Sequence, residues 1–135
     1  MADITVTAAN VKQVSGVPQT YTAGETITQG QPVYLDTNSK VQPGVCTAAA
    51  TATVVGIALT GASADQPCIV LTSGEVNIGG TVVVGTSYVL SATNTNGKIC
   101  PWSDLVSTNK VSFIGYGKTA TNIALDIQNT GLAIP

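Results

Sequence analysis

The chain has 135 residues, enough for one domain and too few for a second independent core. Only 9% of the residues are charged against 44% hydrophobic, the formal net charge is −2, and the five lysines are scattered, so the composition argues against direct binding to nucleic acid. Histidine is absent, which removes the commonest metal ligand and general base. We therefore expect a protein that is not an enzyme and that uses no metal and no cofactor.

The N-terminal residues and the cysteines suggest where the chain is made. No basic region followed by an apolar run opens the sequence, so we expect no secretory signal and synthesis in a cytoplasm. No apolar stretch approaches the roughly 20 residues that span a bilayer, and we expect no membrane partner. Cys46, Cys68 and Cys100 form no Cys-x-x-Cys pair, and we favour three buried free thiols over one disulfide with a thiol left over.

Strand-like segments follow one another along the whole chain, separated by short turns. Residues 3–8 alternate apolar and polar side chains, as do residues 122–127, so each segment predicts a strand with one buried face. The Asn96-Gly97 dipeptide predicts a hairpin turn, whereas the alanine- and threonine-rich residues 46–53 fit either a loop or a short helix. Further strands are expected at 32–36, 54–60, 67–72, 75–78, 81–84, 87–91 and 111–117. The predicted fold is all-β, a compact β-barrel or β-sandwich.

An internal repeat is the most informative feature of the sequence. Five positions recur at a constant offset of 55: Gly24, Thr26, Ile27, Gly30 and Leu35 match Gly79, Thr81, Val82, Gly85 and Leu90. We interpret residues 24–74 and 79–131 as two similar β-meander units packed against each other. They make one domain, residues 23–135, preceded by residues 1–22 as an N-terminal arm or first strand. The alternative is that turn residues recur by chance in a glycine-rich β protein.

The single tryptophan and the seven acids offer little chemistry. Trp102 follows Cys100-Pro101, and we favour a core side chain under a loop over an interface anchor. The acids stand isolated, so a glycosidase pair of carboxylates finds no support. A carbohydrate platform normally needs several coplanar aromatic rings, and the aromatic residues here are few.

Several short motifs, taken in order, resemble the decoration proteins of tailed-bacteriophage capsids, the cement or head-fibre-type family. The resemblance covers about residues 20–132. The motifs that carry it lie at residues 23–27, 30–35, 54–62, 70–76, 85–92 and 97–99. The cysteines belong to no pattern of that family, and the arm is where we expect its members to differ most.

The resemblance implies a structural protein without catalytic residues that binds the outer surface of a phage head and stabilises the shell. It implies the major capsid protein as partner, self-association with a trimer favoured and a dimer possible, and a place on the outer capsid of the virion after synthesis in the bacterial host cytoplasm. The alternative function is a carbohydrate- or receptor-binding β module of a phage tail or cell surface. The arm could add as a strand to a neighbour's sheet edge or could close its own barrel. The candidate interface consists of Asp3, Ile4, Thr5, Val6, Thr7, Ala8 and Trp102.

Overall fold

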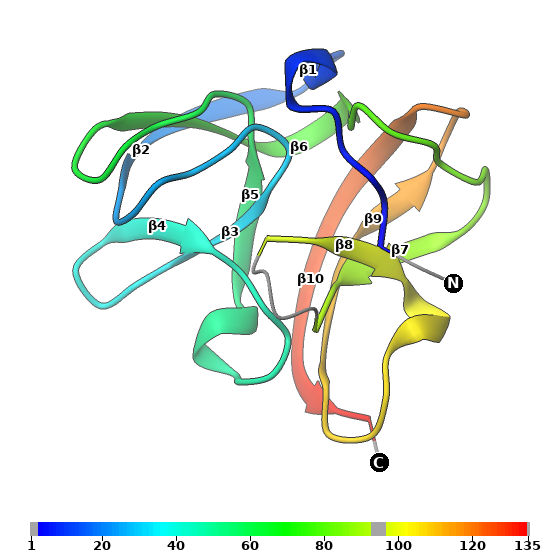
Figure 1. The fold of residues 1–135 in the computed structure, drawn as a ribbon. Helices are drawn as coiled ribbons and strands as arrows, with labels where there is room; N and C mark the ends of the chain where they lie inside the picture. Colours follow the sequence, from blue (N-terminus) through cyan, green and yellow to red (C-terminus); the bar gives the residue numbers. More distant parts are fainter. Residues whose placement is uncertain (1–2, 93–96, 135) are drawn as a thin grey trace.

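The structure is a computed structural model that describes residues 3–92 and 97–134 (Figure 1). The all-β prediction is confirmed: regular structure in these residues consists of ten strands and three 3-10 turns. The turns are η1 (Ala8–Asn10), η2 (Ala50–Ala52) and η3 (Trp102–Asp104). Within the described part of the chain, no helix is both long and apolar enough to cross a membrane.

Five strands close into a small barrel, in the order β2-β4-β3-β5-β6 with β2 returning to β6. The pair β2–β4 is parallel and the others are antiparallel. The interior of the barrel is filled mainly by small and β-branched residues, among them Ala23, Val33, Val41 and Val70. The bounds are β2 Val17–Ala23, β3 Pro32–Leu35, β4 Lys40–Pro43, β5 Val54–Ala58 and β6 Pro67–Asn77.

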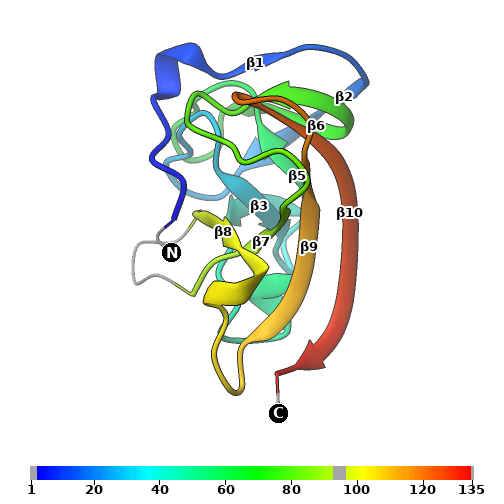
Figure 2. The same ribbon diagram turned by 90° about the vertical axis from the view of Figure 1, so that its right-hand side faces the viewer.

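A second layer of strands continues from β6, which is long enough to leave the barrel. The order runs β6-β10-β9-β7-β8, and the short β1 pairs with the other side of β6. Figure 2 looks at this layer from outside, with β8 toward one edge and β10 toward the other. The bounds are β1 Lys12–Gln13, β7 Ser87–Leu90, β8 Ile99–Pro101, β9 Lys110–Gly117 and β10 Asn122–Ala133.

The larger core lies between the barrel wall and this second layer. Side chains alternate along β5 and β6, so Ala58 and Val70 point into the barrel while Ile57 and Leu71 belong to the larger core. Ile114 and Ile123 join the larger core from β9 and β10, and both are fully buried. Because both faces of β5 are largely buried, its sequence is a nearly continuous apolar run, whereas β6 alternates at first, with Ile69 39% exposed between the buried Cys68 and Val70.

Gly74 is the joint between the two layers. Pro67 to Ser73 of β6 pair with β2, and Gly74 to Asn77 pair with β10. Gly74 has φ +104, and a Cβ there would overlap the backbone of Ser15 and Gly16. Glycine is required because no other residue combines that dihedral with so close a crossing of two backbones.

The strand order is the same in the two halves of the chain. The first half is arranged β4-β3-β5-β6, and the second β8-β7-β9-β10. The matched residues Gly30 and Gly85 have φ +88 and +84, and each precedes its strand by two residues. A Cβ at Gly56 of β5 or at Gly115 of β9, the corresponding strands of the two halves, would meet a carbonyl oxygen of the next strand. These similarities support an internal duplication, whose boundaries at 24–74 and 79–131 remain a prediction.

Several predicted elements need correction. Of the predicted strand 3–8, residues 3–7 form no strand and Ala8 begins η1; residues 81–84 also form no strand, and the Val82 N–H bonds to Ala120 O. The segments 67–72 and 75–78 are one strand, since Gly74 bends β6 without ending it. Residues 17–22, predicted as part of an N-terminal arm or first strand, lie in barrel strand β2, and β4 was not predicted.

Two further predicted segments have a simpler outcome. Residues 46–53 contain turns and η2, so a short helical turn lies within a loop. The turn before Gly97 lies outside the described residues, although β7 and β8 pair antiparallel on either side of it.

Glu75 provides a pH test of the contact between the two layers. Its carboxylate accepts hydrogen bonds from Lys118 Nζ at 2.7 Å and Asn122 Nδ2 at 2.6 Å, and these bonds hold its pKa below the usual 4.5. A lowered pKa stabilises the folded state above pH 4.5 and less as the pH falls through the folded-state pKa.

We expect Glu75→Gln to lower the unfolding temperature at pH 7 and to flatten its decrease below about pH 4.5. Thermal unfolding followed by circular dichroism between pH 3 and 7 measures both effects. Glu25→Gln, at an exposed position, controls for the loss of one negative charge. An unchanged slope in Glu75→Gln would show that this carboxylate does not govern acid unfolding.

Candidate functional site

The first described residues pack against the same domain to which they belong. The Ile4 N–H donates to Ile99 O of β8 at 2.9 Å, and the Thr7 N–H donates to Gly79 O at 2.8 Å. Ile4 is 7% exposed in the larger core, Val6 packs against it, and Thr5 is exposed. The predicted alternation of buried and exposed side chains is therefore present, although the segment has no strand ladder.

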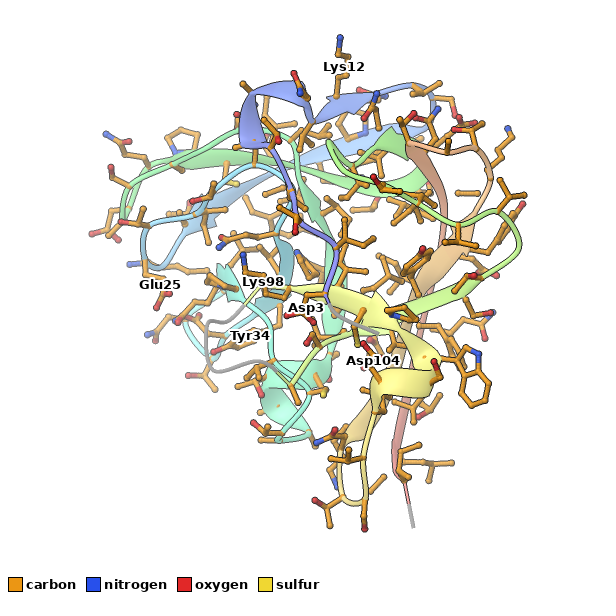
Figure 3. The ribbon with its side chains drawn as sticks, turned by 45° about the vertical axis from the view of Figure 1, so that its right-hand side comes forward. Asp3, Lys12, Glu25, Tyr34, Lys98 and Asp104 are labelled. Carbon is orange, nitrogen blue, oxygen red and sulfur yellow. The ribbon has the colours of Figure 1, made fainter. Side chains whose placement is uncertain are left out.

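Three glycines make room for residues 3–10. From here on, the name arm refers to these residues alone and not to the predicted arm of residues 1–22. A Cβ on Gly30 would lie 2.7 Å from Val6 Cγ1, one on Gly79 would lie 2.5 Å from Thr7 O, and one on Gly80 would lie 2.5 Å from Thr5 O. Real side chains do not tolerate such distances. Figure 3 shows the path of the arm, from Asp3 in front of β8 to Lys12 at the far end of the molecule.

The arm and the segment before Trp102 meet at the β8 edge. A hollow of about 590 Å³ is lined by Asp3, Ile4, Thr5 and Thr7 of the arm together with Gly79, Gly80, Thr81, Val83, Tyr88 and Pro101. Trp102 follows directly and begins η3. Asp3, Ile4, Thr5 and Thr7 thus share a hollow with Pro101, the residue before Trp102, whereas Val6 packs against the core and Ala8 begins η1.

Trp102 is not the core side chain that we favoured. It is 60% exposed, because η3 turns the chain outward after β8. Val106 and Leu132 are 64% and 69% exposed, and the loop that carries Val106 bonds to Ile134 at the end of β10. Exposed apolar side chains at one end of a molecule are typical of a protein contact.

The three cysteines are free and buried, as predicted. Burial raises the pKa of each thiol, most of all that of Cys100, which reaches about 12. A thiol with so high a pKa stays protonated at neutral pH and is a poor nucleophile. Among residues 3–92 and 97–134 there is no group of three or more side chains placed to hold a metal ion.

A groove on the outer face of the second layer was missed by the sequence analysis. It has a volume of about 190 Å³ and is lined by Ser87 of β7, by Phe113, Gly115 and Tyr116 of β9, and by Asp126 and Gln128 of β10. The sequence signal was weak: Asp126 and Gln128 alternate with the apolar Leu125 and Ile127, as in any strand with one exposed face. Strand register decides which of these side chains share a face, and local sequence does not determine it.

Comparison with known families adds a finding that this geometry alone does not provide. A family model described as phage cement protein matches residues 2–73, just over half of the chain. The chain belongs to the phage cement protein family. A search of curated proteins found no match.

The matched region has a clear structural meaning. It contains the arm and nearly the whole barrel, and it ends at Ser73, directly before the Gly74 joint. The family resemblance inferred from the ordered motifs is therefore confirmed, and the chain is a structural component of a phage capsid. The second layer, with the groove and Trp102, lies beyond the match.

Proposed function

We propose that this cement protein binds the outer surface of the phage head, contacts the major capsid protein and stabilises the assembled shell. The family match over the arm and barrel carries the proposal. The strand-rich fold supports it, because a rigid binding surface loses little conformational entropy when it docks.

Stabilisation would follow from binding only the assembled lattice. A ligand that binds one state and not the other shifts the equilibrium toward the bound state by mass action, so occupied shells should resist disassembly. Many copies bridging neighbouring capsid subunits add their contributions, so modest affinity at each site is enough.

The proposed contact surface is the β8 edge, where Ile4 bonds to Ile99 and the arm shares a hollow with Pro101, the residue before Trp102. The arm is bonded to its own chain through Ile4 and Thr7, so it would act through its exposed side chains rather than by leaving to join a neighbour's sheet. Trp102 would act as an aromatic anchor, a role for which large exposed rings are suited.

Self-association is also part of the proposal, with a trimer favoured over a dimer by analogy with three-fold sites of shells. The exposed apolar residues Trp102, Val106 and Leu132 support self-association, because burying them in an interface is favourable for a chain with so few charges. Light scattering of the purified protein measures the mass, and a monomer of 13.6 kDa both in solution and on the capsid contradicts the proposal.

The test of function uses purified protein and bare heads. We expect the protein to co-sediment with assembled heads, in numbers proportional to the capsid lattice, and to raise the temperature at which the heads open. Bound copies are counted by gel densitometry and head opening is followed by dye access to DNA. Failure to bind any assembled shell, or specific binding to a glycan array instead, would favour a receptor-binding role.

A further inference from the structure

An irregularity in β9 places two aromatic rings on the same face of the sheet. Tyr88 pairs with Gly115 and Val89 with Phe113, so Ile114 has no partner in β7. Such a bulge shifts the alternation of side chains by one residue. Phe113 and Tyr116 consequently both line the outer groove, while Ile114 stays in the core and Gly115 leaves the floor open.

The neighbouring strand is irregular at the same level. Leu125 pairs with Gly115 and Gln128 with Phe113, so β10 has two residues, Asp126 and Ile127, where β9 has one. Asp126 and Gln128 lie two residues apart and both reach the groove, while Leu125 and Ile127 face the core, and Gln128 Nε2 donates to Asp126 Oδ2 at 3.2 Å. The groove thus combines two aromatic rings with a carboxylate.

Asp126 has no cation of its own within the described residues. The ion pairs there are Lys40 with Asp65 and Lys118 with Glu75, and each lysine nitrogen is 2.5–2.7 Å from its carboxylate. Asp126 is exposed and Tyr116 is 49% exposed, so water solvates the charged carboxylate alongside the Gln128 amide. If another surface covered it, a positively charged partner would be needed to offset the loss of water.

We propose that this groove binds a basic side chain, best an arginine, on the surface of the capsid protein. The inference rests on the proposed function and adds a second contact, on the outer face of the second layer. An arginine guanidinium stacks on aromatic rings and donates two parallel hydrogen bonds to a carboxylate, which matches Tyr116, Phe113 and Asp126. The volume of about 190 Å³, roughly six times that of a liquid water molecule, suits one side chain rather than a length of peptide.

The chemistry of the groove can be tested without capsids. Nα-acetyl-arginine amide at millimolar concentration should shift the NMR resonances of Tyr116, Phe113 and Asp126, whereas the citrulline analogue, equal in shape but uncharged, should not. Asp126→Asn should abolish the shifts. Equal shifts with both compounds, or shifts produced by neutral sugars at the same residues, would overturn the proposal.

The role of the groove in attachment needs binding to bare heads. We expect Asp126→Asn to weaken binding about tenfold and to reduce its dependence on salt. Tyr116→Ala should also weaken binding, and Tyr116→Phe, which keeps the ring, should restore it. Glu25→Gln removes the same charge on the barrel side and should bind like the native chain (Figure 3).

The two experiments separate the possible failures. If the native chain does not co-sediment with heads, the proposed function fails, and the arginine titration still decides the chemistry of the groove. If the native chain binds heads but Asp126→Asn binds equally well, the proposed function stands and the groove has no part in attachment. Circular dichroism of each variant shows whether a loss of binding comes from misfolding.

Discussion

Replacement of Gly74 by alanine is expected to remove a large part of the stability of the protein. The residue must adopt φ +104, where a Cβ is strained by about 1–2 kcal/mol, and that Cβ would also overlap the backbone of Ser15 and Gly16. Separation of these backbones breaks the pairing of β2 with β6 at the joint between the layers. The combined cost is about 3–5 kcal/mol, a large part of the 5–15 kcal/mol typical of a domain.

Gly85 provides the matched control for this substitution. It has φ +84, and no atom lies within 4 Å of the position that a Cβ would take. Gly85→Ala should therefore show the backbone strain alone, about 1–2 kcal/mol. Chemical denaturation measures the free energy of unfolding of both variants. Equal losses of stability would show that β6 does not cross Ser15 and Gly16 tightly at Gly74.

Replacement of Gly80 by valine is expected to displace the arm while leaving the barrel folded. The added Cβ would lie 2.5 Å from Thr5 O and 2.7 Å from Ile4 Cγ2, and φ at Gly80 is not positive, so steric overlap is the cause. Loss of the buried Ile4 side chain from the core costs about 2–3 kcal/mol. Limited proteolysis should then cut within residues 3–10, and binding to bare heads should fall with it.

The control for the arm variant is Gly61→Ala. Its nearest neighbour would be Ile27 O at 3.4 Å, an ordinary contact, so neither proteolysis of the arm nor head binding should change. If Gly80→Val loses the arm but binds heads normally, attachment does not depend on residues 3–8. If it unfolds completely, the arm is an integral part of the core.

The sequence alone was sufficient for the fold class and for the burial of the cysteines. Short Val/Ile/Leu runs between glycine- and asparagine-rich turns, with no helical period, leave few alternatives to a β structure. The alternation in residues 3–8 also placed Ile4 and Val6 inward correctly, because side-chain direction in an extended chain is a local property. The order of short motifs was enough to predict the family, which the match over residues 2–73 confirms.

Only the tertiary structure decided which extended segments became strands and which faces were covered. A strand needs a partner, and the partner of β2 is β6, some 50 residues away, while residues 3–7 and 81–84 find no ladder. Local sequence could not show that Gly74 bends a strand instead of ending it, or that η3 turns Trp102 into solvent. The groove around Asp126 depends on the bulge in β9 that puts Phe113 and Tyr116 on one face, and register between strands is determined by packing over the whole sheet.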